Sequence, residues 1–316
     1  MFKQLIKGLW GGLVIKRKVI QIANSTQLIS LPRKWAQKYS IKKGDELDIE
    51  EEGSSLKVSV DKGLQVEKVE VDVSGIGVMA KRVIAALYKS GYDEVHVKFS
   101  TTEELKYVQE VLKETCIGFE ITSQEKNSLT AKAISSAVYS EFDSILRRSF
   151  LFLSSMIRES LEAIKKQDTT SLNNTILMDD NLDKFTDFCR RILNKKGYPT
   201  FRKTPPVYYI VEELEKIGDE CKDICELLVK NPVKINKDTI AVYSEIAEFF
   251  DFFHELFYKF ELAKVTVFEK KKDDLNKKIG LLLDKSGRDE VKVLLHLSIL
   301  VDKIFNLNGA LMAAAL

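Results

Sequence analysis

Apolar residues recur at spacings of three and four through residues 131–316, which predicts helices almost throughout this part of the chain. Proline occurs there only where a helix is expected to begin or end. We expect six helices, although the break between the fourth and the fifth is not visible locally. The first helix is expected over 131–167, the third after Pro205-Pro206 and the fourth from near Asn236. Asp168-Thr169-Thr170-Ser171 caps the second helix, which ends at Gly197, and Ser286 with Asp289 resembles a capping box for the last.

Shorter elements are expected before this helical part. Residues 16–62 contain four β-rich runs and one short helix that can begin at Pro32, because the first turn of a helix leaves the missing N–H of proline without a role. Residues 63–130 alternate strand and helix, which is typical of a small α/β unit. The expected strands are 18–22, 28–31, 46–50, 56–60, 66–73, 94–99 and 119–122, and the expected helices are 33–39, 78–90 and 103–114.

The first 15 residues form a separate amphipathic segment. Its apolar side chains fall on one helical face and include Trp10, while Lys3 and Lys7 lie elsewhere. A basic amphipathic helix of this kind can lie on a membrane surface. It can equally dock on its own protein, and the sequence leaves both interpretations open.

Positive charge is concentrated at the start of the chain. Residues 1–43 contain ten Lys or Arg and no acid, although the net charge of the whole chain is only +2. A dimer would double this charge, which is ample for contacts with DNA phosphates, although a basic dimerisation module would have the same composition. The candidate DNA-binding residues are Lys16, Arg17, Lys18, Arg33, Lys34, Lys38, Lys42 and Lys43.

Pairs of acids spaced four residues apart recur along the predicted helices, each beside an apolar seam. Two side chains at this spacing project from the same helix face, so neighbouring helices can bring two pairs together. Four carboxylates at one place suit Mg²⁺, Mn²⁺, Ca²⁺ or iron, whereas a single pair is more often a solvated helix face. The pairs are Asp179 with Asp183, Glu215 with Asp219, Glu269 with Asp273, and Asp302 with Asn306 in place of a second acid.

These pairs indicate an internal duplication. Asp179 and Glu269 differ by 90 positions, and Glu215 and Asp302 differ by 87. A nearly constant offset predicts two related three-helix units, residues 131–232 and 233–316. Asn306 removes one charge from the second unit, so its cluster is the weaker of the two.

Other chemistry finds little support. Gly75-Ile76-Gly77-Val78-Met79-Ala80 matches a dinucleotide fingerprint, but the surrounding segment has too few strands for a Rossmann domain. The three histidines lack the Glu-x-x-His spacing of di-iron sites. We find no nucleophile–base arrangement and expect neither catalysis nor a small-molecule substrate. The four cysteines show no disulfide spacing, as expected in a reducing cytoplasm.

Leu214-Glu215-Lys216-Ile217-Gly218-Asp219 closely resembles the LERIGD signature of the PhoU family of phosphate-uptake regulators. The resemblance covers residues 131–316. It implies metal clusters, commonly of iron or zinc, with manganese and magnesium also open, on Asp179, Asp183, Glu215, Asp219, Glu269, Asp273 and Asp302. It also implies control of phosphate transport through a transporter and a sensor kinase at the membrane, without catalysis.

Residues 16–60 resemble the SpoVT/AbrB family through Ile29-Ser30-Leu31-Pro32 and Ile41-Lys42-Lys43-Gly44-Asp45-Glu46-Leu47. The resemblance implies an interlaced homodimer of swapped hairpins that often binds DNA. Gln27-Leu28 stands where the family often has Gly-Arg. Fusion of both modules through a small α/β segment is similar to a group of archaeal phosphate-uptake regulators.

We therefore expect a multidomain protein with an AbrB-like β-domain, a small α/β domain and an all-α pair of PhoU-like three-helix bundles. The expected function is phosphate-responsive regulation by a homodimer or higher homo-oligomer that binds metal and DNA. The alternative is a dimeric adaptor that docks on a membrane transporter or sensor without binding DNA. The expected location is the cytoplasm, either free or at the inner face of the membrane.

Overall fold

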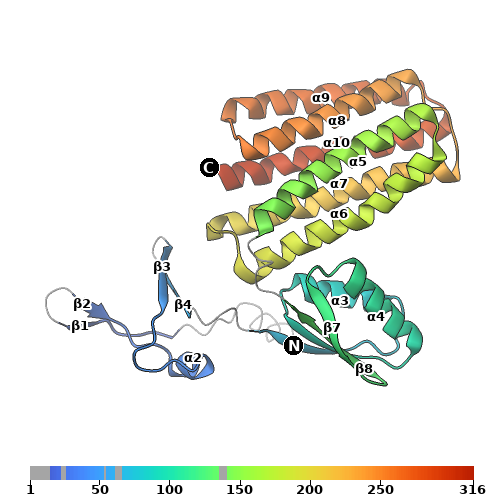
Figure 1. Ribbon diagram of the computed structural model, residues 1–316. Helices are drawn as coiled ribbons and strands as arrows, with labels where there is room; N and C mark the ends of the chain where they lie inside the picture. Colours follow the sequence, from blue (N-terminus) through green and yellow to red (C-terminus); the bar gives the residue numbers. More distant parts are fainter. Residues whose placement is uncertain (1–14, 23–25, 53–54, 61–65, 135–140) are drawn as a thin grey trace, which may run out of the picture. The chain divides into compact units, whose positions relative to one another are not determined.

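The computed structural model describes residues 15–22, 26–52, 55–60, 66–134 and 141–316. The predicted amphipathic segment therefore lies outside the described residues, apart from Ile15. The chain divides into two compact units, Met1–Gln65 and Val66–Leu316 (Figure 1). Each unit is described by itself below.

The first unit consists of two antiparallel hairpins and a short helix, as the sequence predicted. In the first hairpin Gln21 pairs with Gln27, and in the second Glu50 pairs with Lys57. Pro32 occupies the N-cap of the helix, where its missing N–H costs nothing. The elements are β1 (Ile20–Ile22), β2 (Thr26–Leu28), α2 (Arg33–Lys38), β3 (Asp48–Glu52) and β4 (Ser55–Ser59).

No residue whose burial is described in this unit is buried. Its branched apolar side chains face solvent instead, and Val19, Ile49 and Leu56 are about 60% exposed (61%, 63% and 59%). Exposed apolar side chains of this kind are typical of surfaces that bind another protein segment or chain.

The second unit begins with a four-stranded sheet of order β5-β6-β8-β7. β5 runs parallel to β6, whereas β8 is antiparallel to both of its neighbours. β8 was not predicted, because helix was expected from residue 131. The elements are β5 (Lys68–Asp72), α3 (Met79–Lys89), β6 (Glu94–Lys98), α4 (Thr102–Glu114), β7 (Phe119–Gln124) and β8 (Ser128–Ala133).

Six long helices follow the sheet and run side by side (Figure 1). Asp168 caps the second of them, as predicted, and the fourth begins at the expected place, with Asn236 as its N-cap. The predicted capping box before the last helix is wrong, because Gly287 is the N-cap and no side chain accepts a bond there. The helices are α5 (Phe142–Lys166), α6 (Thr169–Lys196), α7 (Thr204–Lys230), α8 (Lys237–Tyr258), α9 (Leu262–Leu283) and α10 (Arg288–Ala315).

α7 is the helix that both halves of the bundle share as a packing surface, since it contacts α6 and α5 on one side and α10 on another. Its predicted seam is confirmed: all six apolar positions are buried. They are Ile210, Leu214, Ile217, Cys221, Ile224 and Leu228.

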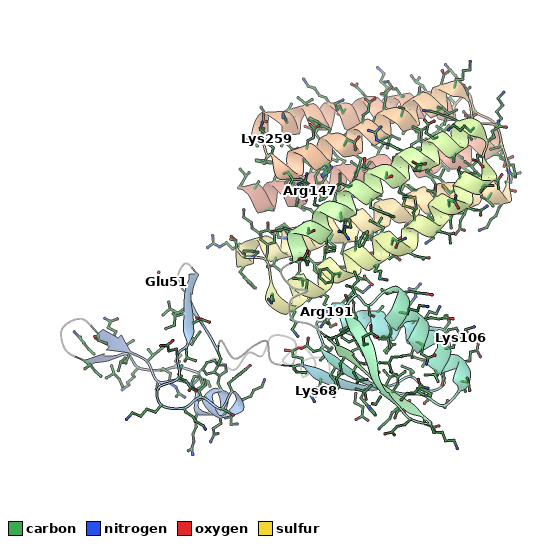
Figure 2. The ribbon with its side chains drawn as sticks, in the orientation of Figure 1. Glu51, Lys68, Lys106, Arg147, Arg191 and Lys259 are labelled. Atoms are coloured by element: carbon green, nitrogen blue, oxygen red, sulfur yellow. The ribbon has the colours of Figure 1, made fainter. Side chains whose placement is uncertain are left out.

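Arg191 of α6 joins the bundle to the α/β part of the same unit (Figure 2). Its guanidinium donates to the carbonyl oxygens of Tyr88 and Tyr92 at 2.9 and 2.6 Å, and to Asp93 Oδ1 at 2.9 Å. The same group lies over the rings of Tyr88 and Phe119 at 5.0 and 4.9 Å. Arg191 is 3% exposed, so the bundle and the α/β part meet through a buried charge with several hydrogen bonds.

α10 is both long and apolar. By length and composition alone it is the one helix in the described part of the chain that could cross a membrane. Its buried residues, among them Leu294, Leu297 and Val301, belong to the core of the bundle. A core helix of this kind satisfies the same criterion without entering a membrane.

Candidate metal centre

Gly218 allows α6 and α7 to approach each other closely at the centre of the candidate site. A Cβ atom added to Gly218 would lie 2.3 Å from Cδ2 of Leu182 and 3.5 Å from Oδ1 of Asp179. Any side chain at this position would push the two helices apart or displace the buried Leu182. The glycine of the Leu214–Asp219 motif therefore brings the acids of α6 next to those of α7.

Asp179 is the most buried of the predicted ligands, with 1% exposure. Lys222 donates to its Oδ2 at 2.5 Å, while Oδ1 is buried and has no hydrogen-bond partner. Burial raises the pKa of Asp179 even though Lys222 opposes the shift. A buried oxygen without a donor is costly, and a cation or water would relieve that cost.

Asp183 follows one turn later on α6 and carries the clearest electrostatic signal. Burial raises its pKa to about 7, and the charges of Asp179, Glu215 and Asp219 act in the same direction. Its Oδ1 is also buried without a hydrogen-bond partner. Carboxylates that repel one another in this way gain most from a cation placed between them.

Glu215 and Asp219 differ in how far their charges are already compensated. Arg190, which is 2% exposed, lies 2.7 Å from Oε2 of Glu215, and it also pairs with Asp187 at 2.7 Å and Glu212 at 2.9 Å. Asp219 lies 3.5 Å from Lys222, and its side chain is 48% exposed. The protein thus partly neutralises two of the acids itself, which lowers the number of charges that a metal would need to balance.

An open groove of about 580 Å³ connects these acids with the α/β part of the unit. Acids of α6 and α7 form one wall, and Lys81, Arg82 and Lys89 of α3 are among the residues of the other. Lys89 reaches across to Asp187 at 3.4 Å. The acids that line the groove are Asp183, Asp187, Glu215, Asp219 and Glu114.

The second half of the bundle does not repeat this arrangement. Glu269, Asp273 and Asp302 are exposed on their helices, and so is Asn306. Lys272 lies 3.4 Å from Asp273, and no buried oxygen without a partner is found on these four residues. They have the character of a solvated helix face.

The donor set of the first half suits a metal that prefers oxygen, because four carboxylates converge on one region and two of them hold buried oxygens without donors. Its oxygens are nonetheless more widely spaced than in a preformed site. Within the described ranges, one group of three donor side chains has its donor atoms within 4.8 Å of one another. It consists of Glu220, Asp223 and His296, none of which the sequence analysis selected.

The reasons for this omission are physical. Glu220 and Asp223 are three residues apart on α7, whereas the metal site was predicted from acids that are four residues apart. His296 lies on α10 and is distant in sequence, so only the packing of α10 on α7 brings it to them. Arg190 likewise gains its role from the close approach of α6 and α7, because it pairs with Glu212 and Glu215 of α7.

The glycine fingerprint at residues 75–80 is used internally. Glu104 accepts bonds from the backbone N–H of Gly75 at 2.6 Å, of Ser100 at 2.9 Å and of Thr101 at 3.0 Å. These bonds lower its pKa to about 2, so it stays ionised. A carboxylate of the protein therefore lies at the turn where a dinucleotide phosphate would be expected.

The candidate DNA-binding residues are all exposed. They are Lys16, Arg17, Lys18, Arg33, Lys34, Lys38, Lys42 and Lys43. Just after the last of them, Asp45 accepts a bond from the backbone N–H of Lys42 at 2.9 Å, which holds the turn before β3.

Comparison with known proteins confirms both resemblances. Residues 146–228, which span most of α5 to α7, match the model of the PhoU domain. Residues 20–72 match the model described as antidote-toxin recognition MazE, bacterial antitoxin. No curated protein matches the chain.

A solved structure with a similar arrangement is the phosphate transport system regulatory protein PhoU from Streptococcus pneumoniae. It is 14% identical with a TM-score of 0.47, and the similarity covers 55% of this chain and 93% of that one. Neither matched domain description names an enzyme. The chain thus carries a PhoU domain at residues 146–228 and a MazE/AbrB-like antitoxin domain at residues 20–72.

Proposed function

We propose that this protein is a non-catalytic regulator of phosphate homeostasis that works as a homodimer, binds a metal ion in its first three-helix unit and binds DNA through its basic N-terminal unit. The observation that carries the proposal is the presence of a PhoU domain and a MazE/AbrB-like domain in one chain. The first suggests what is regulated, and the second suggests how the signal reaches DNA.

Metal binding is supported by the crowded acids between α6 and α7. Asp183 has a raised pKa and a buried oxygen without a donor, and Glu215 and Asp219 line the same groove. Oxygen donors of this kind bind Mg²⁺, Mn²⁺ or iron. The donor atoms of Asp183, Glu215 and Asp219 do not all lie within 4.8 Å of one another, so we expect these side chains to move closer together when a metal binds.

Dimerisation is supported by the absence of buried residues in the described part of the first unit. A second copy can cover the exposed faces of Ile20, Ile49 and Leu56 with its own strands. We expect Ile49→Asp to shift the protein from dimer to monomer in sedimentation velocity experiments. Exposed Asp48→Ala on the same strand is the control and should leave the dimer intact; an unaltered dimer in Ile49→Asp would contradict this role.

DNA binding is supported by eight exposed cations, a number that a dimer would double. The test is a gel shift at increasing salt with the full-length protein and with Arg33→Glu combined with Lys34→Glu. We expect the double variant to lose at least tenfold in affinity, since it reverses two phosphate-contacting charges in each protomer.

The matched control reverses the same number of charges elsewhere. Lys106→Glu with Lys126→Glu alters two exposed lysines of the α/β part and should retain binding. If both double variants bind DNA equally well, the basic unit does not carry the interaction. If the wild-type protein binds no DNA, the dimeric adaptor becomes the better description.

Regulation of phosphate uptake is tested in cells that lack the gene. Uptake of radioactive phosphate should lose its normal response to external phosphate, and the wild-type gene should restore it. Asp183→Asn combined with Glu215→Gln should fail to restore it if the metal is part of the signal. An unchanged response in the deletion strain would refute the proposed function.

A further inference from the structure

α7 presents acids on two different faces. Glu215 and Asp219 lie toward α6, as described above, whereas Glu220 is bonded to side chains of α10. Glu220 and Asp223 are three residues apart, so they project from the same side of the helix. This second face lies between the two halves of the bundle.

His296 of α10 completes a group of three donors with mixed chemistry. Its Nδ1 lies 2.9 Å from Oε2 of Glu220, and one carboxylate oxygen of Asp223 lies within 4.8 Å of the other donor atoms. The residue Glu220 is 9% exposed, which places this carboxylate at the packed contact between α7 and α10. Two carboxylates and one imidazole are a donor set that first-row divalent metals accept with three protein ligands and an open position.

The charges around this group leave room for a cation. Asp223 makes no hydrogen bond or ion pair among the described residues, and burial and the charge of Glu220 raise its pKa. Lys303 lies 3.5 Å from Oε1 of Glu220, and no ion pair joins it to Asp223 among the described residues. Lys222 and Asp219 act on Asp223 from α7 itself, with opposite signs.

We propose that Glu220, Asp223 and His296 bind a divalent first-row metal ion, with Zn²⁺ as the best candidate, between the two halves of the bundle. This site is separate from the groove of Asp183, Glu215 and Asp219 and goes beyond the proposed function. The ion would take the position between Nδ1 of His296 and the two carboxylates, and Lys303, whose side chain is long and flexible, would turn toward solvent. Binding would tie α7 to α10 and therefore stabilise the junction of the two halves.

The competing explanation is an ion pair of His296 with Glu220 that needs no metal. The two explanations differ in what they require of Asp223, since the hydrogen bond involves only Glu220. They also differ in the response of the imidazole to added Zn²⁺. A histidine-specific measurement therefore separates them.

The experiment uses full-length protein labelled with ¹³C at the histidine Cε1, stripped of metal and titrated with Zn²⁺. The chain has three histidines, His96, His254 and His296, so each signal can be assigned by a single substitution. We expect one equivalent of Zn²⁺ per chain to shift the signal of His296 and leave the other two in place. A His296 signal that does not respond to excess Zn²⁺ would overturn the proposal.

Asp223→Asn is the discriminating variant, because Asp223 is exposed and its loss should not affect folding. We expect it to weaken the Zn²⁺ response of His296 at least tenfold, whereas Glu226→Gln, an acid on the same helix that pairs with Lys230, should leave it unchanged. Equal responses in both variants would overturn the proposed ligand set. Asp183→Asn with Glu215→Gln should retain the response, which separates this site from the metal site of the proposed function.

Discussion

Asp183→Asn should stabilise the metal-free protein. The structure gives Asp183 a pKa of about 7, against 3.8 for an ordinary aspartate, because burial and neighbouring acids disfavour its charge. A pKa that is higher by one in the folded protein than in the unfolded chain corresponds to about 1.4 kcal/mol, so ionising this side chain in the folded protein costs up to about 4 kcal/mol. Partial solvation and local rearrangement reduce the expected gain to roughly 1–3 kcal/mol at pH 8.

The pH dependence of this gain follows from the direction in which the pKa of Asp183 moves on folding. Between about pH 4 and pH 7 the folded protein holds a proton on Asp183 that the unfolded chain has lost, so the stability contribution of Asp183 falls as the pH rises. The asparagine has no such dependence. The advantage of Asp183→Asn should therefore be small at pH 4, grow up to pH 7 and stay constant above it.

The assay is urea denaturation followed by circular dichroism at 222 nm, in the presence of a chelator, at several values of pH. Asp180→Asn, the same substitution at an exposed neighbour on α6, is the control and should alter stability by less than about 0.5 kcal/mol. Added Mn²⁺ should stabilise the wild-type protein more than Asp183→Asn. If Asp183→Asn is no more stable than the wild type at pH 8, the acids are not crowded as described.

Two further predictions concern packing. Gly218→Ala should be less stable than Gly280→Ala by about 1–3 kcal/mol in thermal or urea denaturation. The added methyl group meets buried Leu182 at position 218 but open space at position 280. Equal stabilities of the two variants would contradict the close approach of α6 and α7. Arg191→Ala should cost about 2–5 kcal/mol and make the α/β part more sensitive to proteolysis, since it removes three hydrogen bonds and two ring contacts at the junction. Arg191→Lys should not restore the lost stability, because lysine lacks the planar guanidinium of arginine. Lys184→Ala, also on α6, is the control and should have little effect. Similar protease sensitivity in Arg191→Ala and Lys184→Ala would refute the role of Arg191.

The sequence predicted the elements well where periodicity and capping agree. The cap at Asp168, the helix start near Asn236 and the seam of α7 follow from side-chain types and spacings, and the structure confirms them. β8 was missed because its alternating residues precede a long helical pattern and were assigned to it. The start of α10 was misplaced because glycine, and not Ser286, occupies the N-cap.

The candidate site was predictable only in part. The spacing of Asp179, Asp183, Glu215 and Asp219 identified the acids that α6 and α7 bring together, and the structure adds Arg190 and Lys222 as their counter-charges. These cations belong to no motif, because their positions depend on helix packing. Whether Glu269, Asp273 and Asp302 hold a metal stays a prediction, and their exposure gives it no support.

If the proposed homodimer supplies the apolar core that the described part of the first unit lacks, the order of this unit depends on protein concentration. If two copies must meet before these strands acquire a core, dilution releases them as an unstructured segment. The amount of regulator in the cell would then set the fraction that can recognise DNA. Scarce chains would remain open to proteases at this end, so the same feature would limit both the activity and the lifetime of the protein.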